Sequence, residues 1–321
     1  MFIEQGIRPQ NKFGRYLIGS LIIIVAAFVG QIPFGVAIAL KSISNGKMNM
    51  PTESSDLMGY LEPNLSLFLL LLSFVFALAA IFLVIKYLHR QTILSVTTSR
   101  PKVDWKRIFF AFGIWAVFNV ITLSADYFSS PEHYVVSFHP MKFAIMAVIA
   151  IAMIPIQTST EEYVFRGYLM QGFGNLARNR WFPLVMTSVI FGSMHIFNPE
   201  VDKMGYFILI YYIGTGFFLG ILTLMDEGME LSLGFHAANN LIGALLVTSD
   251  WSAIQTYSVL KDVSEPTAGY EVILPVFIIF PILLFIFSKK YRWSDWKQKL
   301  TGDIIIPNPI ETHANPDSDL S

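Results

Sequence analysis

Ionisable side chains lie within three long apolar stretches of the sequence, where such groups are rare. Glu161, Glu162 and Arg166 occur in the first stretch. His195 occurs in the second, and His236 occurs in the third, where two asparagines follow it. An ionisable group at the centre of a membrane helix costs roughly 2.5–3.5 kcal/mol on insertion scales. Because several such groups would be hard to tolerate facing lipid, we expect them to face one another or a wet cavity.

The spacing of these residues favours their convergence. Residues four apart lie on one face of a helix. Glu162 and Arg166 are four apart, which predicts an ion pair, and His236 and Asn240 have the same spacing. Small residues that let membrane helices approach closely occur nearby. They are Gly167, Gly192 and Gly234. The three stretches therefore predict one shared pocket.

The side chains of this predicted pocket suit hydrolysis of a peptide bond. That reaction needs a general base, a proton donor for the leaving amine and donors for the developing oxyanion. A desolvated carboxylate such as Glu161 can act as the base, and His195 can share the water or pass on its proton. His236 and Asn240 offer N–H donors on one helix face. Arg166 can neutralise the neighbouring carboxylate and fix the geometry.

The elements that must position these residues are membrane helices. Of 321 residues, 54% are apolar and only 14% are charged, against about 25% charged in soluble domains. Eight continuous apolar runs have the length needed to cross a bilayer, and their continuity favours helices over a barrel. They are Leu17–Leu40, Leu65–Ile85, Ile108–Ala125, Phe143–Thr160 and onward, Trp181–Phe197, Tyr206–Met225, Leu231–Thr248 and Val272–Ser288. We expect an all-α integral membrane bundle of about eight helices with an intramembrane polar cavity.

Lys and Arg are concentrated in alternate loops, which indicates the orientation. Basic residues precede the first run, follow the second, precede the fifth and follow the last. By the positive-inside rule, both termini are cytosolic in a multi-pass protein, which we expect in the plasma membrane of a prokaryote. We expect residues 1–300 to form a single transmembrane domain with a motif-bearing core at about 143–248. The tail at 301–321, with little apolar content, is expected to be disordered.

Composition also excludes several classes of function. The formal net charge is −1, so no basic excess indicates a nucleic-acid partner. The chain contains no Cys, which excludes disulfides, thiolate metal sites and a cysteine nucleophile.

Three short motifs follow one another along these three apolar stretches. Residues 161–166 match E-E-x-x-x-R, residues 191–195 match F-x-x-x-H, and residues 236–240 match H-x-x-x-N. In these motifs the chain resembles the CPBP family of intramembrane peptidases, which includes CAAX prenyl proteases and bacteriocin-processing enzymes. It is similar in particular to type II CAAX prenyl endopeptidases. The region carrying the motifs covers roughly a third of the chain.

The resemblance implies an eight-helix membrane endopeptidase acting on a membrane-associated peptide or protein that can be prenylated. It implies that Glu161 and His195 activate the water. It implies that His236 and Asn240 hold the oxyanion, and that the second Glu and the Arg of the first motif, Glu162 and Arg166, support the site.

The sequence leaves the metal question open. Two His and one Glu can hold a catalytic zinc with an open water position, and Glu161, His195 and His236 would be those ligands. No H-E-x-x-H helix occurs. The motifs therefore fit both an intramembrane metalloprotease and a metal-free mechanism based on glutamate.

Two other classes of function remain as alternatives. Buried Glu, His and Arg also mark proton-coupled transporters, which would spread such residues along a path through the membrane. A non-enzymatic scaffold or immunity protein of the same fold is the other alternative.

The depth of the motifs raises a geometric difficulty. If the fourth run continues to about Asn175, Glu161 lies roughly 20 Å from the cytosolic end at 1.5 Å per residue. His236 is only a few residues into the seventh run, so we expect it about 10 Å shallower on the same rise, unless that helix begins earlier or is tilted.

Overall fold

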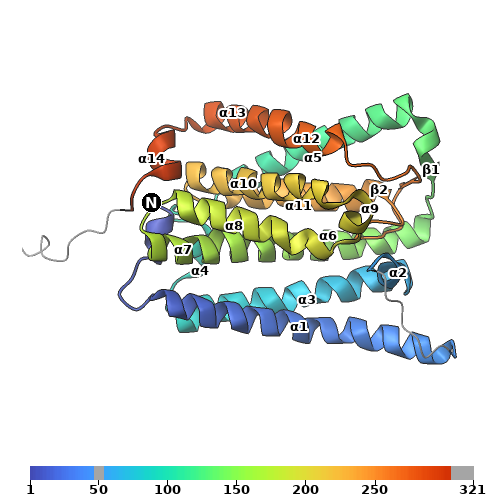
Figure 1. The fold of residues 1–321 in the computed structure, drawn as a ribbon, viewed down its shortest axis with the longest axis horizontal. Coiled ribbons are helices and arrows are strands. Elements are labelled where there is room, and N and C mark those ends of the chain that lie inside the picture. The colour runs from blue at the N-terminus through green and yellow to red at the C-terminus, as the bar shows by residue number, and fades with distance from the viewer. Residues whose placement is uncertain (47–53, 305–321) are drawn as a thin grey trace, which may run out of the picture.

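The computed structural model describes residues 1–46 and 54–304 as a bundle of long helices (Figure 1). All eight predicted runs correspond to helical segments. Six of these segments are long and apolar enough to cross a membrane. They are α1 (Phe13–Ser44), α3 (Pro63–Leu83) extended to Leu88, α5 (Trp105–Ser129), α6 (Pro140–Glu162) extended through α7 (Met170–Ala177), α10 (Leu209–Asp226) with the turn before it, and α12 (Tyr270–Leu274) extended through α13 (Phe280–Tyr291).

The remaining two predicted runs form shorter helices. One is α8 (Trp181–Ser193), which continues as a 3-10 turn to Phe197, and the other is the 17-residue α11 (Glu230–Leu246). Both carry predicted site residues. The protein is thus an all-α integral membrane bundle.

Short elements cap the two ends of the bundle. The end with the N-terminus carries α4 (Ile93–Thr97), α14 (Trp296–Thr301) and a 3-10 turn at Ile3–Gly6. The opposite end carries α2 (Ser54–Gly59), α9 (Pro199–Met204) and a small sheet. Both described ends of the chain therefore lie at the same end of the bundle (Figure 1).

The small sheet was not predicted. Its strands are β1 (Tyr134–Val136), β2 (Val247–Thr248) and β3 (Leu260–Asp262), in the order β1-β3-β2. β1 runs antiparallel to β3, with Tyr134 opposite Asp262, and β2 runs parallel to β3. Strands of two or three residues are too short for periodicity to reveal. The sheet joins the α5–α6 connection to the segment that follows α11.

Close helix packing depends on small residues, as the sequence predicted. A Cβ on Gly216 of α10 would lie 2.7 Å from the Ser188 carbonyl oxygen of α8. A Cβ on Gly234 of α11 would clash with the Ile108 carbonyl of α5. Without a strong hydrophobic drive between helices in lipid, such close contact supplies much of the association energy. These glycines bring the helices that carry the site together.

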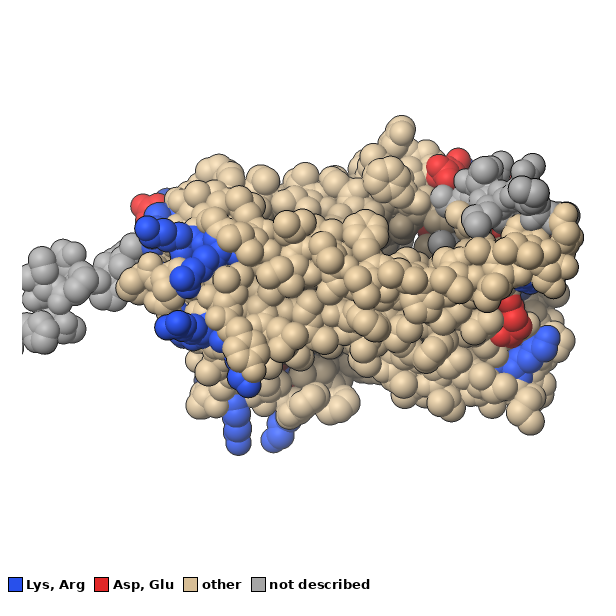
Figure 2. Space-filling model, turned by 90° about the horizontal axis from the view of Figure 1, so that it is seen from below, with Lys and Arg blue, Asp and Glu red and all other residues tan. Residues whose placement is uncertain are grey.

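The outside of the bundle has the polarity of a membrane protein. Large apolar side chains of α1, among them Leu17, Leu21 and Phe28, are more than half exposed. Seen from the α1 side, Lys and Arg gather at the end with the N-terminus, and a wide apolar band separates them from the charges at the other end (Figure 2). Such a band is what a lipid-facing surface requires.

The predicted tail at 301–321 lies outside the described residues from position 305 onward. Its first residues belong to the fold. Thr301 ends α14, Asp303 forms a β-bridge with Asn179, and the Ile304 side chain is buried.

Candidate active site

The first motif lies where α6 changes its winding. Glu161 and Glu162 are the last residues of α6, and a π-helical segment, Tyr163–Leu169, follows directly before α7. Single turns of π-helix inside α-helices occur frequently at functional sites. The Arg166 Nη1 lies 3.1 Å from the Glu162 Oε1, and both side chains are fully buried. The ion pair expected from the spacing is therefore present.

His236 joins this pair from the neighbouring helix α11. Its Nδ1 lies 2.8 Å from the Glu162 Oε1, and its Nε2 lies 3.3 Å from the Glu161 Oε2. Arg166 also donates from Nη2 to the Gly216 carbonyl oxygen on α10, at 3.2 Å. The cluster thus joins two carboxylates to one guanidinium and one imidazole. Such mutual pairing is what lets several ionisable groups lie at this depth.

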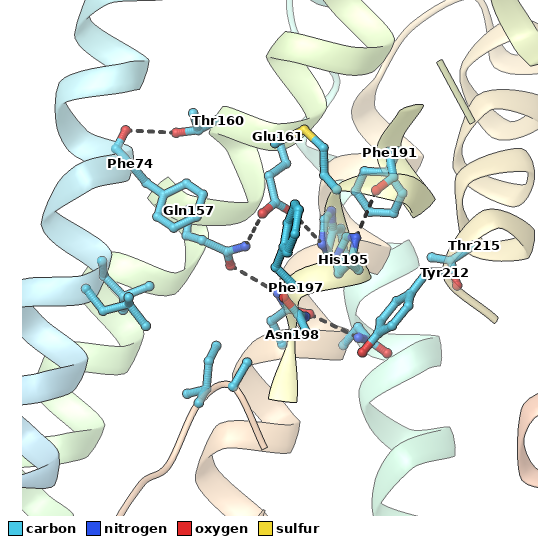
Figure 3. Close-up of a pocket in the computed structure, with 18 of the residues that line it drawn as sticks. Phe74, Gln157, Thr160, Glu161, Phe191, His195, Phe197, Asn198, Tyr212 and Thr215 are labelled. Carbon is cyan, nitrogen blue, oxygen red and sulfur yellow. Dashed lines mark hydrogen bonds and ion pairs between the residues drawn. The ribbon is translucent and has the colours of Figure 1, made fainter. Parts of the chain in front are cut away.

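The two glutamates of the motif differ in their surroundings. Glu162 is enclosed by Arg166 and His236. The Glu161 side chain keeps 18% of its surface exposed, and its Oε1 accepts a hydrogen bond of 2.8 Å from the Gln157 amide (Figure 3). Within the described chain, no Lys or Arg nitrogen lies within 4.0 Å of the Glu161 carboxylate. Glu161 is therefore the more accessible of the two carboxylates.

His195 approaches from the end of α8. Its Nδ1 lies 2.8 Å from the Phe191 carbonyl oxygen one turn earlier (Figure 3). Because a carbonyl only accepts, Nδ1 carries the proton in a neutral ring, and Nε2 keeps its lone pair. The Tyr212 ring of α10 stacks on the imidazole, with centroids 4.3 Å apart and planes at 19°. This stacking holds the ring at the cavity.

Asn240 is the asparagine of the third motif that reaches the cluster. Its Nδ2 donates to the Gln157 Oε1 at 3.0 Å. Asn239 turns toward α5, where it accepts a hydrogen bond of 3.0 Å from the Trp115 indole. His236 and Asn240 thus share one face of α11, as their spacing predicted.

A cavity of about 940 Å³ connects these residues. Glu161, His195, His236 and Asn240 all line it, whereas Glu162 and Arg166 lie behind its wall. The remaining lining is mostly apolar and comes from α1, α3, α6, α8, α10 and α11, together with the segment that follows α11. The structure therefore brings four of the six predicted site residues to one cavity and places the other two in direct support.

Two segments that line the cavity, one containing Glu200 and the other Ala253, are joined by a hydrogen bond. Glu200, on α9 just beyond His195, accepts a hydrogen bond of 2.8 Å from the Ala253 backbone N–H. Burial raises the pKa of the Glu200 carboxyl, and this hydrogen bond partly offsets the effect. Glu200 thus joins the element after His195 to the segment after α11.

The expected difference in depth between Glu161 and His236 is not observed, because their side chains are in contact. The segment at 97–100 covers the α10–α11 turn, where the Met229 N–H donates to the Thr97 carbonyl at 2.8 Å. Glu230, the first residue of α11, is fully buried. The helix therefore begins well inside the protein, and counting residues from its start underestimates the depth of His236.

Two residues of the site were missed by the motif analysis. Gln157 lies one turn before Glu161 on the same face of α6, and a Gln in an otherwise apolar run was a usable signal. Tyr212 gave no signal, because aromatic residues are common throughout these helices.

The predicted zinc ligands do not form a metal cluster among the described residues. No group of three His, Asp or Glu side chains there is arranged around a single point. The anchoring of both imidazoles through Nδ1 does resemble the way proteins orient metal-binding histidines. The donor chemistry therefore suits an ion, but the arrangement of the three groups does not.

Comparison with known proteins supplies the family. The family model described as "Type II CAAX prenyl endopeptidase Rce1-like" matches residues 140–242, which include α6 through most of α11 and all three motifs. The predicted family is thus confirmed over these residues. This match supports a CAAX-type intramembrane protease at family level.

A bacterial relative extends the similarity beyond the motif region. The chain is 29% identical over 246 residues to an uncharacterised Bacillus subtilis (strain 168) protein named YyaK, which covers 75% of this chain and 81% of the relative. No solved structure matches the chain.

Proposed function

We propose that this protein hydrolyses a peptide bond in a membrane-associated substrate, with Glu161 and His195 activating the attacking water. One observation carries the proposal. Glu161 is a carboxylate without an Arg or Lys partner in the described chain, and it shares a largely apolar cavity with the free Nε2 side of His195. A base and an acceptor around one desolvated space are what water activation requires.

The proposed reaction begins with a water held between these two side chains. The Glu161 carboxylate takes one proton of the water, while the His195 Nε2 accepts a hydrogen bond from the other. The hydroxide attacks the carbonyl carbon of the scissile peptide bond. Glu161 then returns the proton to the leaving amine, so that the base ends the cycle ionised.

Two side chains can donate hydrogen bonds to the oxyanion. His236 can donate from Nε2, which lies 3.3 Å from the Glu161 Oε2, when both of its ring nitrogens carry a proton, and its Nδ1 is held by Glu162. Asn240 uses its amide nitrogen to contact Gln157, and the nitrogen has a second N–H left to donate. Preorganised donors of this kind stabilise the developing negative charge in a site that excludes water.

Glu162 and Arg166 serve this reaction without touching the substrate. Arg166 binds Glu162 on the side away from the cavity, and Glu162 accepts from the His236 Nδ1. This carboxylate holds the proton on Nδ1 and so fixes the orientation of the His236 ring, and only a second proton, on Nε2, can be donated toward the cavity.

The cavity supports a substrate that arrives from the bilayer. Apolar side chains of α1 and α3, including Ile23, Ala27 and Leu71, line it beside the polar cluster. An apolar surface next to a hydrolytic centre suits a peptide that carries an isoprenoid or other lipid group. We propose such a peptide as substrate, in a protein with both termini cytosolic.

The test is cleavage by purified protein in detergent, followed by mass spectrometry. Farnesylated peptides ending in a CAAX sequence are compared with the same peptides without the lipid, and Glu161→Gln is the matched control. Release of a carboxyl-terminal fragment by the wild type and not by the variant is expected. Activity that chelation removes and zinc restores would replace the metal-free mechanism by the metalloprotease alternative. If neither protein cleaves any candidate peptide, a scaffold or transporter function replaces the proposal.

A further inference from the structure

Two arginines bind the end of α3 at the end of the bundle with the N-terminus. The Arg15 Nη1 donates to the Leu88 carbonyl oxygen at 3.2 Å, and the Arg8 Nη1 donates to the Arg90 carbonyl oxygen at 3.1 Å. Cationic side chains bind the last carbonyls of a helix in this way, because those oxygens have no partner within the helix. The two accepting carbonyls are two residues apart, so the two guanidinium groups are held near each other.

No carboxylate among the described residues neutralises this pair. Three other arginines at the same end of the bundle have acidic partners: Arg100, Arg107 and Arg180. Glu4 lies on the same N-terminal segment as Arg8, but it contacts Arg180. No Asp or Glu oxygen in the described chain lies within 4.0 Å of the Arg8 or Arg15 side-chain nitrogens. Because like charges held together repel each other, the pair favours an anion from outside the protein.

More positive charge surrounds the pair. Lys12 precedes α1, Lys86 lies at the end of the α3 extension, and Arg90 follows it, all with exposed side chains. Within the described structure, no side chain caps the N-terminus of α1, and an uncapped helix N-terminus attracts anions. Figure 2 shows Lys and Arg gathered at this end of the bundle. We call these side chains the basic cluster, which consists of Arg8, Lys12, Arg15, Lys86 and Arg90.

The basic cluster borders the lipid-facing surface. Leu17 and Ile18 follow Arg15 within one turn of α1, and both are more than half exposed. Tyr87, beside Lys86, is also more than half exposed. Tyrosine is enriched where a membrane meets water, and large exposed apolar side chains belong in the hydrocarbon. The cluster therefore lies at the depth of the lipid headgroups.

We propose that the basic cluster binds the phosphate group of an anionic phospholipid. A guanidinium presents its N–H groups in a planar fork that matches two phosphate oxygens. Arg8 and Arg15 use part of each fork on backbone carbonyls and keep further N–H groups for the phosphate. An anionic headgroup fits better than a zwitterionic one, because the surplus of cations repels a choline or ethanolamine group.

A lipid bound here joins three parts of the protein. Its phosphate contacts the N-terminal segment, the start of α1 and the end of α3, and its acyl chains lie along the exposed apolar side chains of α1. A ligand that binds the folded protein and not the unfolded chain raises stability. The anionic lipid should therefore stabilise the protein against heat.

The test measures lipid binding by the purified protein in a neutral detergent, through native mass spectrometry and thermal unfolding. Dioctanoyl phosphatidylglycerol is compared with dioctanoyl phosphatidylcholine, which has the same acyl chains, and with inorganic phosphate, which has none. Arg8→Gln with Arg15→Gln removes the pair, and Arg8→Lys with Arg15→Lys keeps its charge without the fork. Lys289→Gln with Lys290→Gln is the matched control, because it removes the same charge from α13 at the same end of the bundle.

We expect phosphatidylglycerol to bind more tightly than phosphatidylcholine and to raise the unfolding temperature more. Each arginine near an anionic lipid raises affinity about fivefold, so the double Gln variant should bind phosphatidylglycerol roughly thirtyfold more weakly than the wild type. The double Lys variant should lose less affinity than the double Gln variant. The α13 control should bind like the wild type.

Three results would overturn the inference. They are equal binding of the two lipids, stabilisation by inorganic phosphate equal to that by phosphatidylglycerol at the same concentration, and an equal loss of affinity in the α13 control. If the double Gln variant does not fold, Arg90→Gln, at an exposed side chain, decides the question with an expected loss of about fivefold. None of these measurements needs turnover, so their outcome is independent of the proposed function.

Discussion

Two clusters of buried carboxylates in this protein are built in different ways. At the end with the termini, Asp226 and Glu230 each contact the Arg100 guanidinium at 3.0 Å, and Arg107 also binds Asp226. In the middle of the bundle, Glu162 has its arginine, whereas Glu161 has only a histidine, an amide and the cavity. The first cluster satisfies each carboxylate with a permanent cation. The second leaves one carboxylate without a permanent cation, which is why we propose it as the place for chemistry.

The two clusters also have different roles in the protein. Arg100 bridges the segment before α5 to the α10–α11 turn and so fixes where α11 begins. That fixed start places His236 and Asn240 at the depth of Glu161. We therefore expect changes at the end cluster to act through stability, and changes at the inner cluster to divide between stability and rate.

Arg166→Ala should have the largest effect on stability. It leaves Glu162, which is fully buried, without its cation. Breaking a buried pair by removing one partner costs about 3–5 kcal/mol. Thermal unfolding in detergent should show this loss together with low yield and low activity. The double variant Arg166→Ala with Glu162→Gln should recover part of the stability. A single variant as stable as the wild type would contradict the assignment of the pair.

Asn240→Ala should separate rate from stability in the inner cluster. Loss of one oxyanion donor lowers the rate by roughly 10²–10³ in comparable sites. Steady-state kinetics on a confirmed substrate should show the loss mainly in kcat. Asn239→Ala is the neighbouring comparison, because Asn239 also lines the cavity but uses its oxygen to bind the Trp115 indole and its nitrogen to bind Asn240, so its loss should cost less. If the Asn239 variant loses more rate than the Asn240 variant, the two residues have been given the wrong roles.

Arg100→Ala should weaken the fold and spare the chemistry. Glu230 is fully buried, so its carboxylate would lose a cation but keep its contact with the Asp104 backbone N–H, at 3.3 Å. We expect about 1–3 kcal/mol of destabilisation. The fraction that stays folded should retain a kcat close to that of the wild type. A large fall in kcat without a loss of stability would show that the Arg100 cluster also affects the rate.

The pH dependence of stability should test a third buried ionisable group, His89. It lies at the end of the bundle where both described ends of the chain are found. Its Nδ1 lies 3.0 Å from the Asn11 Oδ1 and its Nε2 lies 3.0 Å from the Tyr168 hydroxyl. Burial, helped by the nearby charge of Arg15, lowers the pKa of His89 to about 4. The unfolded chain binds this proton near pH 6.5, so the stability contribution is complete above that pH and is lost as pH falls toward 4.

Because of this linkage, the free energy of unfolding should be lower at pH 5 than at pH 7 by about 1–2 kcal/mol. The difference in unfolding temperature between these two pH values should be smaller in His89→Gln than in the wild type. An identical pH dependence in both proteins would mean that His89 is not held neutral.

Much of the fold and part of the site could be predicted from the sequence. The eight helical segments follow from apolar length, and the contact between Glu162 and Arg166 follows from helical spacing, because both are local properties. The depth of His236 could not be predicted, since the start of α11 is set by contacts with the distant segment at 97–100.

The hydrogen bonds between side chains of different helices show the limit most clearly. Gln157 could have been noticed as a polar residue in an apolar run, but nothing local connects it to Asn240. The connection exists only because α6 and α11 pack together, so it follows from tertiary structure and not from a motif.

The most direct test of the account compares the two adjacent carboxylates of the first motif in one experiment. Glu161→Gln and Glu162→Gln each remove one negative charge at nearly constant size. We measure single-turnover cleavage of a confirmed peptide and thermal unfolding on the same preparations. We expect Glu161→Gln to have no detectable turnover and nearly wild-type stability, and Glu162→Gln to lose stability as well as activity, because it disturbs Arg166 and His236. Cleavage by Glu161→Gln at the wild-type rate would contradict the account.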